Sequence, residues 1–364
     1  MVQPRPEVLS MPGYTPGRSI ASVARELGLQ DIIKLASNES LWGTSERVLA
    51  AARESLGQLF QYPEVVPVTL VELLAERSGF SADEILVGNG ADELLRLVAN
   101  AYVKPGDRVL YPTPSFAAYA YGASLMGATG VPVPVLPEGA MDLDVMANQV
   151  AGDTPLIYLC SPNNPTGGIF RHDAWETFLR RVDGRALIVV DQAYREFVDD
   201  PEYARIEEAI HQGAPVAMVR TFSKLYALAG ARIGWMAAPP SVIEILRRVR
   251  EPFSLNAVGI AAATEALRDQ KYFDHVLQET LDMRQWLKEA LALRGLPVME
   301  SQANFLTFGC PMEARSMARL MERQGVIIRP TTSFGLPNHC RVSMAPRPAL
   351  ERFLAALDYV IGHA

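Results

Sequence analysis

The stretch L-I-Y-L-C-S-P-N-N-P-T-G-G-I-F-R-H-D-A-W-E-T-F-L-R-R-V-D-G-R-A-L-I-V-V, residues 156–190, decides the fold class. It begins with a continuous apolar run, passes through an amphipathic helical segment at 173–182, and ends in a second apolar run at 187–190. Apolar strands that alternate with helices are typical of a mostly parallel sheet covered by helices on both faces. The stretch therefore predicts an α/β domain.

Similar signals extend along the chain. Short apolar runs typical of buried strands recur at 108–111, 131–135, 216–219 and 233–238. Helical segments are expected from about residue 46, at 69–79 with a terminal glycine, and at 241–250 and 257–294. The late segments F-L-T-F, V-I-I-R and C-R-V-S-M indicate short strands of a second domain.

These signals predict three regions. We expect residues 1–45 to form an amino-terminal arm, extended over its first 19 residues, and part of the small domain. Residues 46–251 are expected to form the large domain and residues 252–364 the small domain. The segment P-F-S-L-N at 252–256 is the expected hinge.

Composition narrows the class of partners. The formal charge of −7 is spread along the 364 residues without a basic block, so nucleic acid is not expected as a partner. The three cysteines are widely spaced and form no C-x-x-C motif, which predicts reduced thiols and no metal site. No apolar run is long enough for a membrane span, and the first ten residues lack the apolar core of a secretory signal. We therefore expect a cytoplasmic protein that does not bind membranes.

Polar residues follow three of the expected strands. Asn164 lies in the loop after 156–160, Asp191 and Tyr194 follow 187–190, and Lys224 follows 216–219. Ligands in open α/β sheets bind beyond the carboxyl ends of the strands. Taken singly, each residue also has a structural interpretation: a turn, a paired or capping carboxylate, and a lysine that extends to solvent.

One ligand accounts for all of these residues. The glycine-containing turn before the helix at 91 predicts an anion site of backbone N–H groups at residues 90–92. Pyridoxal 5′-phosphate supplies a phosphate for that turn, a basic ring nitrogen for Asp191, and an aldehyde that reacts with the Lys224 amine. Dry surroundings and nearby cations favour the neutral, nucleophilic form of that amine. Further contacts are expected from Asn164 and Tyr194 to ring substituents, and from Ser223 and Arg232 to the phosphate.

The motifs S-P-N-N-P-T-G at 161–167, D-Q-A-Y at 191–194 and S-K-L-Y-A-L-A-G-A-R-I-G at 223–234 resemble those of the fold-type I aminotransferases. Within that family the chain is most similar to the histidinol-phosphate aminotransferases, through K-L-A-S-N-E at 34–39, Y-P-E at 62–64 and G-N-G-A-D-E at 88–93. The resemblance covers residues 10–345 approximately. It implies a large domain with a mostly parallel seven-stranded sheet covered by helices, and a smaller α/β domain.

The resemblance also implies individual roles. Lys224 would be the catalytic lysine, Asp191 the partner of the ring nitrogen, and Phe116 the residue stacked on the ring. The ring oxygen would be contacted by Asn164 and Tyr194, and the phosphate by Ala91, Asp92, Ser223 and Arg232. Tyr62 would reach the cofactor of a neighbouring subunit, which implies a homodimer. Substrate contacts would come from Arg341 at the α-carboxylate or its counterpart, and from Arg329 and Tyr14 at the distal end.

Two departures from the family pattern leave more than one substrate to consider. Leu225 stands where the family usually has a small residue, and S-L-W-G-T-S-E at 40–46 replaces N-P-x-G-P-S-P, so Trp42 falls in a segment that lies close to the substrate in relatives. The first hypothesis is transamination of histidinol phosphate with 2-oxoglutarate. The alternatives are an aromatic amino-acid aminotransferase with an apolar pocket formed by Phe116, Trp42 and Trp235, a phosphothreonine-type decarboxylase, and a cofactor-binding regulator without catalysis. An Arg329 that faces the pocket would favour a phosphorylated substrate.

Overall fold

The computed structural model describes residues 2–9, 11 and 17–363. Its largest sheet has seven strands, in the order β2 (Ile85–Gly88), β8 (Gly234–Ala237), β7 (Val216–Thr221), β6 (Leu187–Asp191), β5 (Leu156–Cys160), β3 (Arg108–Thr113) and β4 (Thr129–Pro134). β8 runs antiparallel to both of its neighbours, and the other pairs in this sheet are parallel. Every residue of β5 and β6 is buried, as expected for strands covered on both faces. The predicted α/β class is confirmed.

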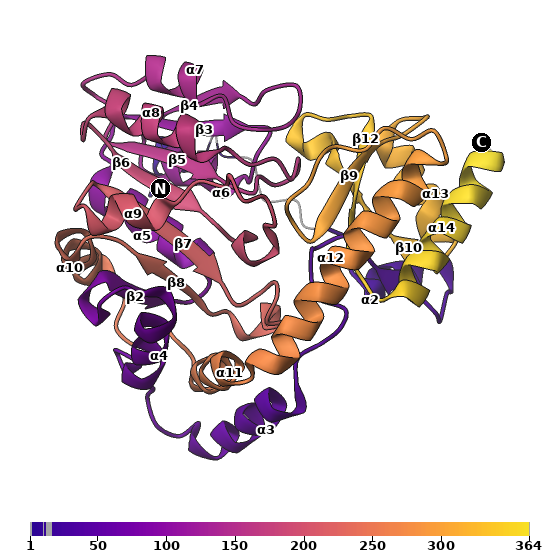
Figure 1. The fold of residues 1–364 in the computed structure, drawn as a ribbon, viewed down its shortest axis with the longest axis horizontal. Helices are drawn as coiled ribbons and strands as arrows, with labels where there is room; N and C mark the ends of the chain where they lie inside the picture. The colour runs from indigo at the N-terminus through magenta and orange to yellow at the C-terminus, as the bar shows by residue number, and fades with distance from the viewer. Residues whose placement is uncertain (1, 10, 12–16, 364) are drawn as a thin grey trace.

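Helices cover this sheet (Figure 1). The helices of the large domain are α3 (Glu46–Ser55), α4 (Val68–Ser78), α5 (Ala91–Tyr102), α6 (Ala118–Leu125), α7 (Leu143–Asn148), α8 (His172–Val182), α9 (Ile206–His211), α10 (Pro240–Val249) and α11 (Ala257–Arg268). Among them, α3 packs mainly against α11. Helix α8 buries Trp175, Phe178 and Val182, which recur at helical spacing on one face. Helix α4 ends at Gly79, whose left-handed conformation lets its N–H donate to the carbonyl of Ala75, as the terminal glycine predicts.

The smaller domain contains a three-stranded antiparallel sheet in the order β11 (Arg329–Pro330), β12 (His339–Ser343) and β9 (Phe305–Gly309). Its helices are α12 (Gln270–Ala292), α13 (Ala314–Arg323) and α14 (Arg347–Gly362). The amino-terminal segment contributes α2 (Ile20–Leu27) and β1 (Ile33–Lys34), and β1 pairs in parallel with β10 (Val326–Ile327). The amino-terminal and carboxy-terminal parts of the chain therefore build this domain together.

Helix α12 contributes to two hydrophobic cores. Phe273 and Val276, near its start, pack in the core of the seven-stranded sheet, together with α11. Leu287 and Leu291, near its end, pack in the core of the smaller domain. Figure 1 shows α12 extending from the large domain to the smaller one. The sequence predicts the division at residue 252; we propose instead that it lies within α12, because the preceding helix, α11, packs against α3 and α4 of the large domain.

The amino-terminal arm differs from the expected extended segment. It contains a short helix, α1 (Pro6–Leu9), that packs against α6, and the Arg5 guanidinium donates to the carbonyl of Leu125. Pro6 is the first residue of this helix, a position that needs no hydrogen-bonded N–H and suits the fixed φ of proline. Within the described residues, no helix is both long and apolar enough to cross a membrane. The cysteines Cys160, Cys310 and Cys340 are free.

Candidate active site

The carboxyl ends of β5, β6 and β7 bring the predicted residues together. The loop after β5 carries Asn164, β6 ends in Asp191, and Lys224 lies three residues beyond β7. From the smaller domain, the Arg341 side chain on β12 donates to Asn164 Oδ1 and, at 2.8 Å, to the carbonyl of Ala36. The site therefore lies where the two domains meet.

Asp191 is a buried carboxylate whose two hydrogen-bond donors are neutral. Its Oδ2 accepts from the Tyr119 hydroxyl at 2.7 Å, and its Oδ1 accepts from the N–H of Ala193 at 3.0 Å. Burial raises the pKa of Asp191 to about 6, although both hydrogen bonds oppose the shift. A cationic group beside this carboxylate would favour its ionised form.

Lys224 is a partly buried lysine whose surroundings disfavour its protonated form. Its Nζ lies 3.5 Å from the carbonyl oxygen of Ser37 and 5.5 Å from the centre of the Tyr194 ring. Burial, followed by the positive charge of Arg341, lowers the pKa of Lys224 to about 8. A substantial fraction of this amine is therefore neutral at slightly alkaline pH, and only the neutral amine is a nucleophile.

The Tyr194 hydroxyl is fixed by two amides. Asn38 Nδ2 donates to it at 3.0 Å and Asn164 Nδ2 at 3.3 Å. Burial raises the pKa of Tyr194 to about 12, so the hydroxyl keeps its proton and remains a donor. The ring also packs edge-on against Phe305 of β9, with centroids 5.2 Å apart. These contacts fix the position of the hydroxyl and of the ring.

The first turn of α5 offers an anion site. Its N-cap, Gly90, forms no side-chain cap, so the N–H groups of Ala91 and Asp92 remain available at the positive end of the helix. Arg232 lies against this turn: its Nη1 is 3.4 Å from Ser223 Oγ, and its Nη2 pairs with the exposed Asp92 carboxylate at 3.2 Å. A Cβ on Gly90 would come within 2.5 Å of the guanidinium. The glycine therefore leaves room for the cation at the helix start.

Two arginines of the small sheet share one face. Arg329 on β11 pairs with Arg341 on β12, and directly opposed residues of an antiparallel pair project to the same side. Both guanidinium groups lie over the ring of Phe334, at 5.8 Å for Arg329 and 6.0 Å for Arg341. Arg329 also donates to Ser333 Oγ at 3.4 Å. Two positive charges thus stand side by side near Asn164.

The remaining predicted residues lie at different distances from this centre. Phe116 is partly buried, and its ring is edge-on to that of Tyr119 with centroids 5.9 Å apart, so it lies near Asp191. Tyr62 is 82% exposed and stacks on Phe253, which separates it from the other site residues of its own chain. Tyr14 falls outside the described residues.

Two polar contacts of the site were not predicted. Tyr119 reaches Asp191 from α6, and Asn38 reaches Tyr194 from the segment after β1. Asn38 belongs to the K-L-A-S-N-E motif, so the motif marks its segment, but no pattern identifies the partner of its side chain. Tyr119 lies three residues after Phe116, but this spacing does not predict its contact with Asp191.

The two departures from the family pattern have different surroundings. Leu225 is buried in the core of the large sheet, so its side chain fills the interior. Trp42 packs against both hydrophobic cores, and its carbonyl accepts from the Tyr272 hydroxyl at 3.1 Å. Trp235 does not belong to a pocket with Phe116, contrary to the alternative considered above. It pairs with Arg220, which stacks on it at 5.5 Å, whereas Asp191 pairs with Val219 and so projects from the opposite face of the sheet.

Comparisons with known proteins agree with this arrangement. Residues 30–357 match the model of the family described as "Aminotransferase class I and II". The chain therefore belongs to the class I and II aminotransferases. The aminotransferase is 42% identical over 359 residues to the histidinol-phosphate aminotransferase of Symbiobacterium thermophilum, with 98% of each chain covered. It is 36% identical to the enzyme of that name from Moorella thermoacetica, covering 98% of this chain and 92% of the relative.

A solved structure is similar over the whole length. The crystal structure of histidinol-phosphate aminotransferase from Sinorhizobium meliloti, in complex with pyridoxal 5′-phosphate, superposes with a TM-score of 0.91 at 30% identity. The match covers 100% of this aminotransferase and 98% of that chain. The seven-stranded sheet expected for fold-type I aminotransferases is thus confirmed.

As a member of this family, the aminotransferase depends on pyridoxal 5′-phosphate. Its own residues fit that cofactor. The uncapped start of α5 beside Arg232 suits a phosphate, buried Asp191 lacks a cationic hydrogen-bond donor, and Lys224 has a depressed pKa. Each feature is unfavourable or incomplete in the chain alone, and the cofactor complements all three.

Proposed function

We propose that the aminotransferase exchanges an amino group between histidinol phosphate and 2-oxoglutarate, giving imidazole acetol phosphate and glutamate, within histidine biosynthesis. The names of its relatives support this substrate. The observation that carries the proposal is the pair Arg329 and Arg341 on one face of the small sheet. A phosphate monoester has nearly two negative charges at neutral pH and matches two guanidinium groups, whereas a carboxylate needs only one.

We assign the cofactor contacts as follows. Asp191 would keep the ring nitrogen protonated, Tyr194 and Asn164 would contact the ring oxygen, and Phe116 would cover one ring face. The phosphate would be held by the N–H groups of Ala91 and Asp92, with Ser223 and Arg232. When bound, the cofactor withdraws electrons from the substrate α-carbon. The Asp92 carboxylate forms an ion pair with Arg232. It would have to give up this ion pair when the phosphate binds to Arg232.

Lys224 moves the proton in this proposal. Its neutral Nζ accepts the proton that leaves the substrate α-carbon, and the nearby Ser37 carbonyl and Tyr194 ring restrict where the Nζ can lie. A pKa of about 8 lets the same nitrogen bind and release a proton near neutral pH. Arg341 orients the substrate by binding the carboxylate of glutamate or the phosphate of histidinol phosphate.

The proposal includes a homodimer. A contiguous stretch of the chain exposes apolar side chains, and these are Leu56, Leu59, Phe60, Tyr62, Val65, Val66 and Val68. Phe253, which stacks on Tyr62, is 43% exposed and joins them. A patch of this kind favours association with a second copy. Tyr62 then points away from its own site because it serves the partner's. A cytoplasmic location remains a prediction.

The test is substrate-dependent change in the cofactor absorbance. The purified protein is loaded with pyridoxal 5′-phosphate, and histidinol phosphate, phenylalanine and phosphothreonine are added separately. We expect conversion to the aminated cofactor with histidinol phosphate alone. Conversion by phenylalanine alone would replace the proposal by an aromatic amino-acid aminotransferase. Carbon dioxide release from phosphothreonine without consumption of a 2-oxo acid would identify a decarboxylase.

A substitution tests the role of the second arginine. Arg329→Gln removes one of the two charges, so the KM for histidinol phosphate should rise by about tenfold or more, with a smaller change for glutamate. Arg315→Gln, at an exposed position of α13, is the matched control and should leave both values unchanged. An equal rise in KM for both substrates would show that Arg329 does not bind the phosphate.

A further inference from the structure

A polar cavity of about 430 Å³ lies apart from the residues around Lys224. Four segments line it: the end of α4, the start of η3 (Arg195–Phe197), α9 and β7. The lining residues are Arg77, Ser78, Arg195, Glu196, Glu207, Met218 and Arg220. Arg220 projects from the face of the sheet opposite to that of Asp191. The cavity is therefore a second concave site, with five charged side chains around it.

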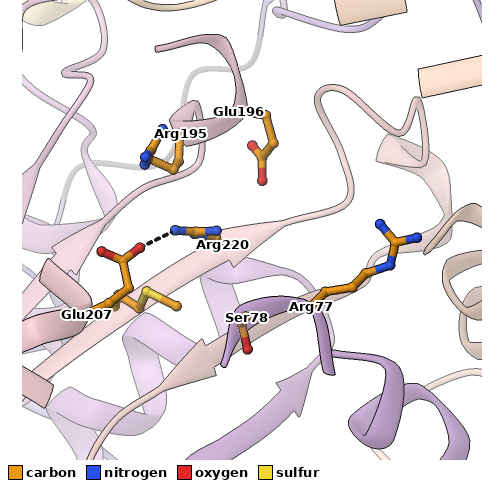
Figure 2. A pocket seen from close by; sticks show the side chains of 7 residues that line it. Arg77, Ser78, Arg195, Glu196, Glu207 and Arg220 are labelled. Carbon is orange, nitrogen blue, oxygen red and sulfur yellow. Dashed lines mark hydrogen bonds and ion pairs between the residues drawn. The ribbon is translucent and has the colours of Figure 1, made fainter. Parts of the chain in front are cut away.

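Two of these charges satisfy each other. Arg220 Nη2 pairs with Glu207 Oε1 at 2.6 Å, and Arg220 Nε donates to Gln192 Oε1 at 3.2 Å. The Arg220 guanidinium also lies 5.5 Å from the centre of the Trp235 ring. Figure 2 shows the Arg220–Glu207 pair on one side of the cavity. The charges of Arg220 and Glu207 therefore compensate each other without a ligand.

Two other lining groups have buried polar atoms without a partner. Among the described residues, neither Arg195 Nε nor Glu196 Oε2 has a hydrogen-bond partner, and both atoms are shielded from solvent. Buried polar atoms are nearly always hydrogen-bonded, so an exception calls for an explanation. One of these atoms is a donor and the other an acceptor. Figure 2 shows the Glu196 carboxylate pointing into the space between Arg220 and Arg77.

We propose that this cavity binds a small zwitterion with an ammonium group and a carboxylate, the chemistry of a free amino acid. The ammonium donates to Glu196 Oε2, while the carboxylate accepts from Arg195 Nε and from the Arg77 guanidinium. Arg77 is exposed at the end of α4, and its guanidinium donates to Gln270 Oε1 at the start of α12, a contact that it would exchange for the ligand carboxylate on binding. Burial raises the pKa of Glu196, and an ammonium group beside it would restore a favourable environment for the charge.

The experiment uses a zwitterion that cannot react at the candidate active site. N,N-dimethylglycine has a tertiary amine, which cannot condense with an aldehyde, but it keeps one N–H donor and a carboxylate. Its binding to the holoenzyme is measured by calorimetry. Isovalerate has the same shape and only the carboxylate, and 2-dimethylaminoethanol has only the cation. We expect dimethylglycine to bind at least about tenfold more tightly than either. Equal binding of isovalerate, or no binding of any probe, would overturn the proposal.

Substitutions locate the binding. Glu196→Gln removes the acceptor charge without changing the shape of the side chain and should weaken dimethylglycine binding by about tenfold. Arg77→Ala, at an exposed position that donates to Gln270 of α12, should weaken it as well. The matched controls are Glu176→Gln on α8 and Arg53→Ala on α3, both exposed and remote from the cavity. Binding that persists in Arg77→Ala would place the ligand elsewhere, including at Arg341, and would sink the proposal even if Glu196→Gln failed to fold.

Discussion

The buried carboxylate of Asp191 destabilises the protein when no cofactor is bound. Its pKa is raised from 3.8 to about 6, so between these values the folded state binds more protons than the unfolded state. The free energy of unfolding therefore decreases as pH rises through this window. Above a pH of about 6, the buried ionised carboxylate lowers the free energy of unfolding by up to about 3 kcal/mol.

Asp191→Asn should consequently stabilise the apoprotein at pH 7–8 while abolishing turnover. An amide at this position can still accept from Ala193 and donate to the oxygen of Tyr119, whose hydroxyl hydrogen rotates away. Denaturant unfolding at several pH values measures the difference, which should shrink towards pH 4. Asp282→Asn, on an exposed part of α12, serves as the control. A variant that is less stable than the wild type at pH 8 would contradict the assignment of a buried, charged Asp191.

Tyr119 acts on the site through Asp191. Tyr119→Phe removes the 2.7 Å hydrogen bond and keeps the ring, which stacks on Tyr158 at 5.0 Å. Loss of a donor to a carboxylate raises its pKa, so the acid limb of the kcat profile should move towards neutral pH and kcat should fall by about tenfold. Tyr158→Phe is a matched control because its hydroxyl donates to the Leu95 carbonyl at 2.8 Å and not to Asp191. Equal pH profiles for the two variants would refute this role.

At the scale of elements, the start of α5 depends on a residue without a side chain. Gly90→Ala would place a Cβ within 2.5 Å of Arg232 Nη2, and φ is +79° there. We expect cofactor affinity to fall by about tenfold or more because the guanidinium must move away from the helix start. Gly28→Ala, in the αL region at φ +68° and ψ 21° with no atom within 4 Å of the added Cβ, is a control for a side chain at positive φ without the clash. Gly90, with ψ 169°, lies in a region that only glycine adopts readily, so its substitution carries a larger backbone cost as well. Cofactor affinity is measured by titration of both variants, and an unchanged affinity in Gly90→Ala would contradict the role of this glycine at the phosphate site.

The sequence predicts elements where local and tertiary preferences coincide. The apolar runs of β5 and β6 and the glycine that ends α4 are visible because the sheet is covered on both faces and the helix ends in a left-handed turn. Helix α1 was not predicted, because a four-residue helix depends on its contact with α6.

The same reasoning separates the site residues. Asp191 and Lys224 follow strands, so their shared edge could be predicted. Tyr119 and Asn38 lie 72 and 156 residues from their partners, and only the folded chain brings them there.

At the scale of the whole molecule, the proposed homodimer predicts complementation between two inactive variants. Lys224→Ala lacks the proton acceptor, and Tyr62→Ala lacks the contact proposed for the partner's cofactor. A mixed dimer would contain one site with both residues, so reassembly from equal amounts should restore up to about a quarter of the wild-type sites. Activity is measured before and after the two variants are unfolded and refolded together. Failure of the refolded mixture to exceed the separate variants, with dimers confirmed by sedimentation, would exclude shared sites.

Helix α12 contributes side chains to both hydrophobic cores, and this ties the two domains together energetically. Melting either end of the helix strips apolar cover from the domain at that end and leaves the remaining turns without neighbouring hydrogen-bonded turns. The two domains should therefore lose their structure in one cooperative event. A destabilising substitution at the carboxy-terminal end of α12, in the core of the small domain, would then unfold the large domain as well.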